Sequence, residues 1–210
     1  MRLIRSLLVI LCCFFSLSIC AHPHSFIEMK TKILGTQTQI TGFHMQWTFD
    51  AITTTYMYDG LDMSSKNKHK TLARLTQSIL TNMKKSHYFI YVYHQDKLMA
   101  LNQVQSARLQ NNQNHQAILT FDVMLAHPLA VTTQDMRFMV YDPTYYVDIF
   151  WNKKSDVSLA KPLMPFYKIK LVEPHPSLEQ MNYATSLDVE THPDNTLGEL
   201  FTQQIVLIAN

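Results

Sequence analysis

The chain has 210 residues, of which 47% are hydrophobic and 16% are charged, so it is long enough to bury one substantial core. Its formal net charge is only +2 and it has no basic block, which gives no reason to expect nucleic-acid binding. Four glycines in the whole chain argue against a glycine-rich phosphate loop.

The first segment, residues 1–21, is a predicted signal peptide. Arg2 and Arg5 supply a basic start, and the apolar run at 7–19 has the length of a secretory core and is too short for a comfortable membrane span. Ala21 is a small residue that suits the position before cleavage. Cleavage there makes His22 the first residue of a mature periplasmic chain, 22–210, which we expect to have no membrane span.

The alternative processing route is lipidation at Cys20, because Leu-Ser-Ile-Cys at 17–20 resembles a lipobox. Ile19 is bulky where a lipobox needs a small residue, so we favour cleavage after Ala21. All three cysteines lie in the leader, so the mature chain has neither disulfides nor thiolate metal ligands. Removing the leader also lowers the 18 basic residues to 16, which equals the number of acidic residues.

Strand patterns open the mature chain. Polar and apolar residues alternate over 25–33, a turn follows at Gly35, and 38–49 alternates again, which predicts two strands. In the second strand, Phe43, Met45 and Trp47 share one face, and His44 lies on the polar face. A short helix is predicted from Ala51, followed by a loop.

The clearest helix is predicted over 66–84, where Leu72, Leu75, Ile79 and Met83 form one apolar stripe, with Ser64 or Ser65 as its cap. Further strands are predicted from runs of β-branched and aromatic residues near 88–94, 116–125, 136–142, 145–151, 166–172 and 203–209. The last run is also compatible with the end of a short helix beginning near Leu197. Together these elements predict a strand-dominated, single-domain α+β fold with one long amphipathic helix on a sheet face.

The predicted mature N-terminus, His22-Pro23-His24, is a candidate metal site. Proline keeps the preceding residue extended, and positions i and i+2 of an extended chain point the same way, so both imidazoles can face one ion. Cleavage would add the α-amine of His22 as another nitrogen donor. Pro23 has no N–H to deprotonate, which excludes a continuous square-planar backbone chelate. A flexible, solvated start is the alternative interpretation.

Two carboxylates and one further histidine could complete the site. Asp50 follows the second strand, and its ordinary role would be to cap the helix that begins at Ala51. Asp142 precedes Pro143, and its ordinary role would be to open a turn. His44 could join from the polar face of its strand. Among the other histidines, His69 in Lys-Asn-Lys-His-Lys reads as a solvated loop residue. The twelve methionines are scattered and read as core residues rather than as copper ligands.

Four motifs carry a resemblance to a known family: "AHPHSFIEM", "GFHMQWTFDA", "YDPTYY" and "LGELFTQQIVLIA". They resemble bacterial periplasmic proteins labelled the periplasmic component of an ABC-type transport system, which accompany nickel/cobalt-type permeases and include ZevA-type members linked to zinc acquisition. The family's recurrent residues map onto His22, His24, Trp47, Asp50, Asp142, Pro143 and Tyr145. Family members often end in a cysteine that could form a disulfide, and this chain ends in Asn210.

These observations predict a periplasmic protein that binds a divalent metal ion, zinc before nickel, cobalt or copper, and serves an inner-membrane metal permease. The expected ligands are His22, His24, Asp50, Asp142 and His44. We expect no enzymatic activity, because the chain has neither a nucleophile elbow nor an HExxH motif. Two alternatives stay open: a copper enzyme that uses the N-terminal histidine, and a non-metal periplasmic adaptor of a transporter.

Overall fold

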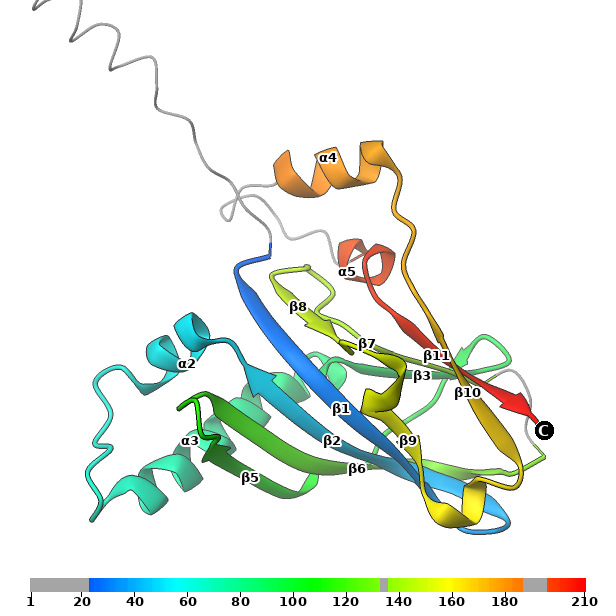
Figure 1. Ribbon diagram of the computed structural model, residues 1–210, viewed down its shortest axis with the longest axis horizontal. Helices are drawn as coiled ribbons and strands as arrows, with labels where there is room; N and C mark the ends of the chain where they lie inside the picture. The colour runs from blue at the N-terminus through cyan, green and yellow to red at the C-terminus, as the bar shows by residue number, and fades with distance from the viewer. Residues whose placement is uncertain (1–22, 133–135, 187–195) are drawn as a thin grey trace, which may run out of the picture.

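The computed structural model describes residues 23–132, 136–186 and 196–210. The predicted signal peptide and His22 therefore lie outside the described residues. The described chain forms two β-sheets and four α-helices in a single domain, which confirms the predicted strand-dominated α+β class. Figure 1 shows β1 (Ser25–Gly35) of the larger sheet in front, with β3 (Ile90–His94) of the smaller sheet and the long helix behind it.

The larger sheet, sheet A, has the strand order β5-β6-β2-β1-β8, and β9 also pairs with β1. Along one edge β1 pairs antiparallel with β2, and along the other it pairs in parallel first with β8 and then with β9. The strands of sheet A are β1 (Ser25–Gly35), β2 (Gln39–Phe49), β5 (Gln105–Asn111), β6 (Ala117–Ala130), β8 (Val147–Phe150) and β9 (Val157–Leu159).

The smaller sheet, sheet B, has the order β10-β11-β7-β3-β4, and its pairings are antiparallel. Its strands are β3 (Ile90–His94), β4 (Lys97–Leu98), β7 (Met136–Val140), β10 (Tyr167–Val172) and β11 (Gln204–Ala209). The core lies between the two sheets, where Phe43 of β2 stacks on Phe138 of β7 with ring centroids 4.2 Å apart. Burying such aromatic side chains is the main favourable term for this packing.

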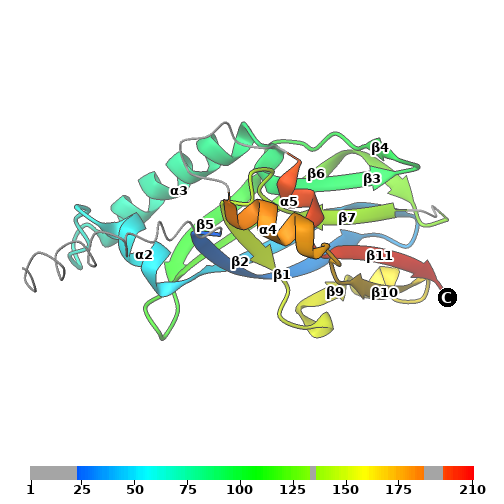
Figure 2. The same ribbon diagram turned by 90° about the horizontal axis from the view of Figure 1, so that it is seen from above.

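The helices are α2 (Ala51–Tyr58), α3 (Lys68–Lys84), α4 (Leu178–Ser186) and α5 (Leu197–Leu200), with 3₁₀ turns at His87–Phe89, Lys154–Asp156 and Lys161–Leu163. Figure 2 shows α3 beside sheet B, on the same side of sheet A. Leu72 and Met83 of α3 are buried in the common core, and Leu75 and Ile79 pack against it, as their spacing predicts.

The two N-terminal strands, the helix from Ala51 and the long helix lie where the sequence predicts them. The prediction that Ser64 or Ser65 caps the long helix is wrong: its N-cap is Asn67, which makes no side-chain capping bond. His69 lies in the first turn of α3 rather than in a loop. The sequence analysis also missed β5, because its residues QSARLQN carry the polar side chains that an exposed edge strand tolerates.

Candidate functional site

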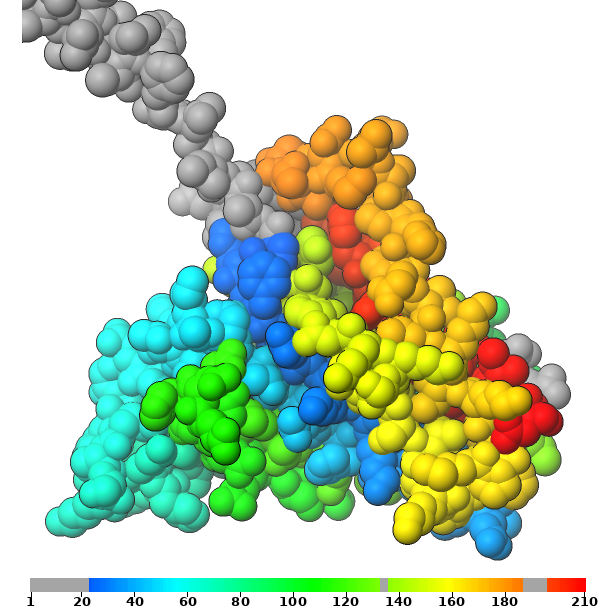
Figure 3. Space-filling view, viewed as in Figure 1, coloured from blue at the N-terminus to red at the C-terminus, as the bar shows by residue number. Residues whose placement is uncertain are grey.

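Three of the predicted site segments meet at one end of sheet A. Phe26 of β1 is hydrogen-bonded to Asp50, which directly follows β2, through both their backbones and the Asp50 carboxylate. On the other side, Ser25 is in register with Val147 of β8, just after the turn that begins at Asp142. The start of β1 therefore lies between the segments that carry Asp50 and Asp142. Figure 3 shows this start (blue) at the molecular surface beside α2 (cyan).

His24 is exposed and extends the pairing of β1 with β8 by one residue. Its backbone N–H donates to the carbonyl oxygen of Tyr146 over 2.9 Å, and its ring lies 4.7 Å from the Tyr146 ring, centroid to centroid. These two contacts hold the imidazole at a defined place on the surface. His24 is thus in contact with Tyr146 through both its backbone and its ring, whereas His22, the other half of the motif, lies outside the described residues.

The carboxylate of Asp50 is occupied by local hydrogen bonds. Oδ1 accepts from the Thr53 N–H at 2.8 Å, and Oδ2 accepts from the Phe26 N–H at 2.9 Å and from the Thr53 hydroxyl at 2.5 Å. Burial alone would raise the pKa of Asp50, but the hydrogen bonds from Thr53, Phe26 and Ile52 outweigh it and lower the pKa. Asp50 thus caps α2 and ties it to β1.

Asp142 is buried, and its carboxylate closes the turn before β8. Oδ1 accepts from the backbone N–H and the hydroxyl of Thr144, at 3.0 and 2.9 Å, and Oδ2 accepts from the Val147 N–H at 3.2 Å. Helix α5 packs closely against this turn: the Gly198 N–H donates to the Pro143 carbonyl oxygen over 2.9 Å, and a Cβ on Gly198 would lie 1.8 Å from the Asp142 carbonyl oxygen. A metal ion would have to compete with these donors for either Asp50 or Asp142.

His44 is not brought to the same place. It lies on the outer face of sheet A, opposite Asp122 of β6, and its Nδ1 is 2.6 Å from Asp122 Oδ1. His44 lies six positions before Asp50 in the chain, which corresponds to about 20 Å along a strand. His44 therefore forms its own exposed pair with Asp122.

Asp148 is the residue that the sequence analysis missed. It lies on β8 in register with Phe26, one residue pair beyond Ser25 and Val147, so its side chain shares a face with Phe26. Burial raises the pKa of Asp148, and no described residue donates a hydrogen bond to its carboxylate. Burial and the Asp148 charge together raise the pKa of Tyr145 to about 12. An aspartate inside the apolar run YYVDIFW was the available signal, since aspartate is depleted in strands.

Within the described ranges, no three His, Cys, Asp or Glu side chains come close enough together to hold a metal ion. His24 and Asp148 supply two candidate donors at this end of sheet A. A third protein ligand would have to come from outside the described residues, where His22 directly precedes Pro23.

Comparison with known proteins gives the family. Residues 7–208 match the family model described as "Protein of unknown function (DUF1007)". The chain belongs to the DUF1007 family. It is similar to an uncharacterized protein of Haemophilus influenzae, with 32% identity over 197 residues that cover 92% of this chain and 94% of the relative. In the described part of this DUF1007 protein, no helix combines the length and the apolar character needed to cross a bilayer.

Proposed function

We propose that this protein is a periplasmic metal-binding protein that captures a divalent ion at the start of its mature chain and delivers it to an inner-membrane permease. Zinc is the first candidate, before nickel, cobalt and copper, because the available donors are imidazole nitrogens and a carboxylate oxygen. The observation that carries the proposal is the position of Asp148 beside the start of β1, as a half-buried carboxylate to which no described residue donates a hydrogen bond.

The proposed ligands are His22, His24 and Asp148. His24 directly precedes β1, and Asp148 lies on the neighbouring strand β8, two residues further along in register, so their Cα atoms are about 8 Å apart from strand geometry. An imidazole, an ion and a carboxylate can bridge that separation with bonds of about 2.0–2.2 Å. Asp50 and Asp142 would support the site by positioning the start of β1 and the turn before β8. A bound cation would also offset the unfavourable burial of the Asp148 charge.

Three protein ligands leave one position of a tetrahedral zinc ion for water or for the ligand of a receiving protein. An exchangeable position of this kind suits capture and release. The permease as the receiving partner follows from the resemblance described above.

Calorimetric titration of the mature protein with zinc, nickel and copper tests the proposal. We expect one ion per chain, with weaker binding at about pH 5.5 than at about pH 7.5 because histidine ligands must be neutral. The double change His22→Ala with His24→Ala, and Asp148→Asn alone, should each remove most of the affinity. His44→Ala and His69→Ala are the controls and should have little effect. Zinc binding that survives both the double change and Asp148→Asn would locate the ion elsewhere.

A second candidate function is a non-metal adaptor that docks on a transporter. It is favoured by α2, which follows Asp50 beside the start of β1 and exposes Ile52 and Tyr56 at 81% and 83% of their surface. Apolar side chains this exposed on one helix are typical of contact surfaces. If the parent protein binds none of the three ions, the adaptor function replaces the metal-binding proposal.

A further inference from the structure

A groove runs between α3 and β5, with a volume of about 640 Å³. Its strand side is formed by the consecutive residues 107–111, and its helix side by residues on one face of α3 between 68 and 77. β5 ends sheet A, and among the described strands it pairs only with β6. The backbone on its other edge is therefore open to a further strand.

The groove is basic. Among the described residues, Lys68, His69 and Arg108 line it, and no aspartate or glutamate does. In the described part of the chain the ion pairs are His44–Asp122 and Arg137–Asp96, so no carboxylate neutralises the three basic groove residues. The N–H groups in the first turn of α3 add partial positive charge, since Asn67 makes no side-chain capping bond there.

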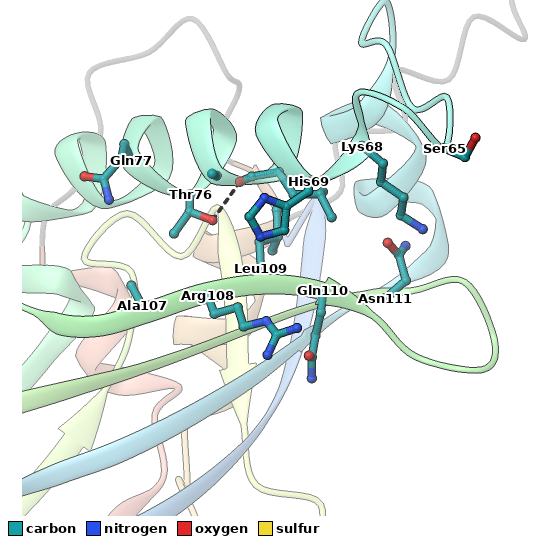
Figure 4. Close-up of a pocket in the computed structure, with 12 residues that line it drawn as sticks. Ser65, Lys68, His69, Thr76, Gln77, Ala107, Arg108, Leu109, Gln110 and Asn111 are labelled. Carbon is teal, nitrogen blue, oxygen red and sulfur yellow. Dashed lines mark hydrogen bonds between the residues drawn. The ribbon is translucent and has the colours of Figure 1, made fainter.

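The basic residues lie on both sides of the open strand edge. Figure 4 shows His69 reaching down from α3 over Leu109, and Arg108 pointing to the opposite side of β5. Leu109 is buried and, with Leu72 and Ala107, gives the groove an apolar floor. A ligand that meets both His69 and Arg108 must therefore pass along the strand edge.

We propose that this groove binds an acidic peptide segment in an extended conformation, added as a strand to the free edge of β5. Residues 107–111 span about 13 Å of strand, and an extended segment of four to five residues has the same length. The main chain of such a segment can bond to the β5 edge, while its alternating side chains point in turn toward His69 and toward Arg108. A compact anion would reach only one of these two sides. Neither His24 nor Asp148, the two described metal ligands of the proposed site, lines this groove, so the two proposals rest on different residues.

The test uses fluorescence polarisation with the mature protein and a labelled eight-residue peptide that alternates valine and glutamate. We expect saturable binding that weakens as salt rises. Arg108→Glu and His69→Glu should each weaken it by about tenfold or more, because both place a negative charge against the acidic peptide. Arg74→Glu is the matched control, since Arg74 lies exposed on α3 without lining the groove, and it should change the affinity by less than about twofold. Ala73→Tyr fills the groove without changing its charge and should also abolish binding.

Two control peptides distinguish strand addition from simple electrostatic attraction. A peptide that alternates valine and lysine should not bind. The valine–glutamate peptide with its backbone N-methylated at alternate residues keeps its charge but loses hydrogen-bond donors, and it should bind at least about tenfold more weakly. Equal binding of the N-methylated peptide, or complete displacement by millimolar succinate, would overturn the proposal in favour of a simple anion site. Failure of the valine–glutamate peptide to bind would also overturn it, as would retained binding in Arg108→Glu and Ala73→Tyr.

Discussion

The carboxylate of Asp148 lies half-buried on β8 without a described hydrogen-bond donor, and burial raises its pKa above the ordinary 3.8. Below that ordinary value the group is protonated in both the folded and the unfolded protein, so its burial has no electrostatic cost. Above the raised folded-state pKa the folded protein must hold a poorly solvated charge, and the full cost is present.

The first prediction follows from this destabilising effect of the Asp148 charge at neutral pH. In protein treated with a chelator, Asp148→Asn should raise the midpoint of thermal unfolding at pH 7, and the difference from the parent should disappear as the pH falls below the ordinary carboxyl value. With excess zinc, the parent should gain more stability than the variant. Circular dichroism melts at both pH values, with and without zinc, measure these differences. A variant that melts below the parent at pH 7 without metal would show that the carboxylate has a stabilising partner.

The second prediction for a single residue concerns Gly198. A Cβ there would lie 1.8 Å from the Asp142 carbonyl oxygen, so Gly198→Ala must displace either α5 or the turn before β8, at a cost of about 3 kcal/mol. Gly60→Ala is the control: Gly60 has a φ of +67° but open space around it, so the change should cost only about 1 kcal/mol of backbone strain. Urea unfolding measures both. An equal loss of unfolding free energy in the two variants would mean that α5 can move away from the turn at no extra cost.

At the scale of elements, α2 depends on Asp50. The carboxylate caps the helix through Thr53 and joins it to β1 through Phe26, and Ser25 and Thr53 add a hydroxyl contact of 2.8 Å. These contacts explain why a short helix with little buried surface is held against the start of β1.

The third prediction is that Asp50→Ala destabilises the protein by about 1–2 kcal/mol, whereas Asp50→Asn loses less because asparagine also caps helices well. The pKa of Asp50 is lowered in the folded protein, so its contribution should be present above about pH 3.8 and lost as the pH falls through the lower folded-state value. Urea titrations of parent and Asp50→Ala at pH 7 and at about pH 2 check this. The unfolding free energies of the two proteins should become equal at the acidic pH. A difference that stays the same at both pH values would contradict the role given to the ionised Asp50 carboxylate.

Both capping roles were predictable from the sequence because they are local: Asp50 bonds to Thr53 three residues later, and Asp142 bonds to Thr144 two residues later. The helix stripe from Leu72 to Met83 was predictable for the same reason. β5 was not, since an edge strand needs no apolar alternation and is defined by its neighbour β6. His69 was assigned to a loop although it falls within the helix predicted over 66–84, and the structure places it in the first turn of α3.

For the whole molecule, the position of the mature N-terminus decides whether a free α-amine lies beside the proposed ligand His22. The fourth prediction is cleavage between Ala21 and His22, which frees an α-amine next to the first imidazole. Intact-mass measurement and N-terminal sequencing of periplasmic material check it. A diacylated chain beginning at Cys20 would contradict it and would leave His22 without a free α-amine.

The sequence by itself determined the elements and their local chemistry: the alternating strands β1 and β2, the stripe of α3, and the two carboxylate caps, all of which depend on neighbours a few residues away. Only the tertiary structure decided which of these meet. The parallel pairing of β1 with β8 brings Asp148 beside His24, and the antiparallel pairing of β2 with β6 directs His44 to Asp122 instead. Strand partners and register depend on burying both sheet faces together, and that requirement involves residues far apart in the chain, which no local pattern encodes.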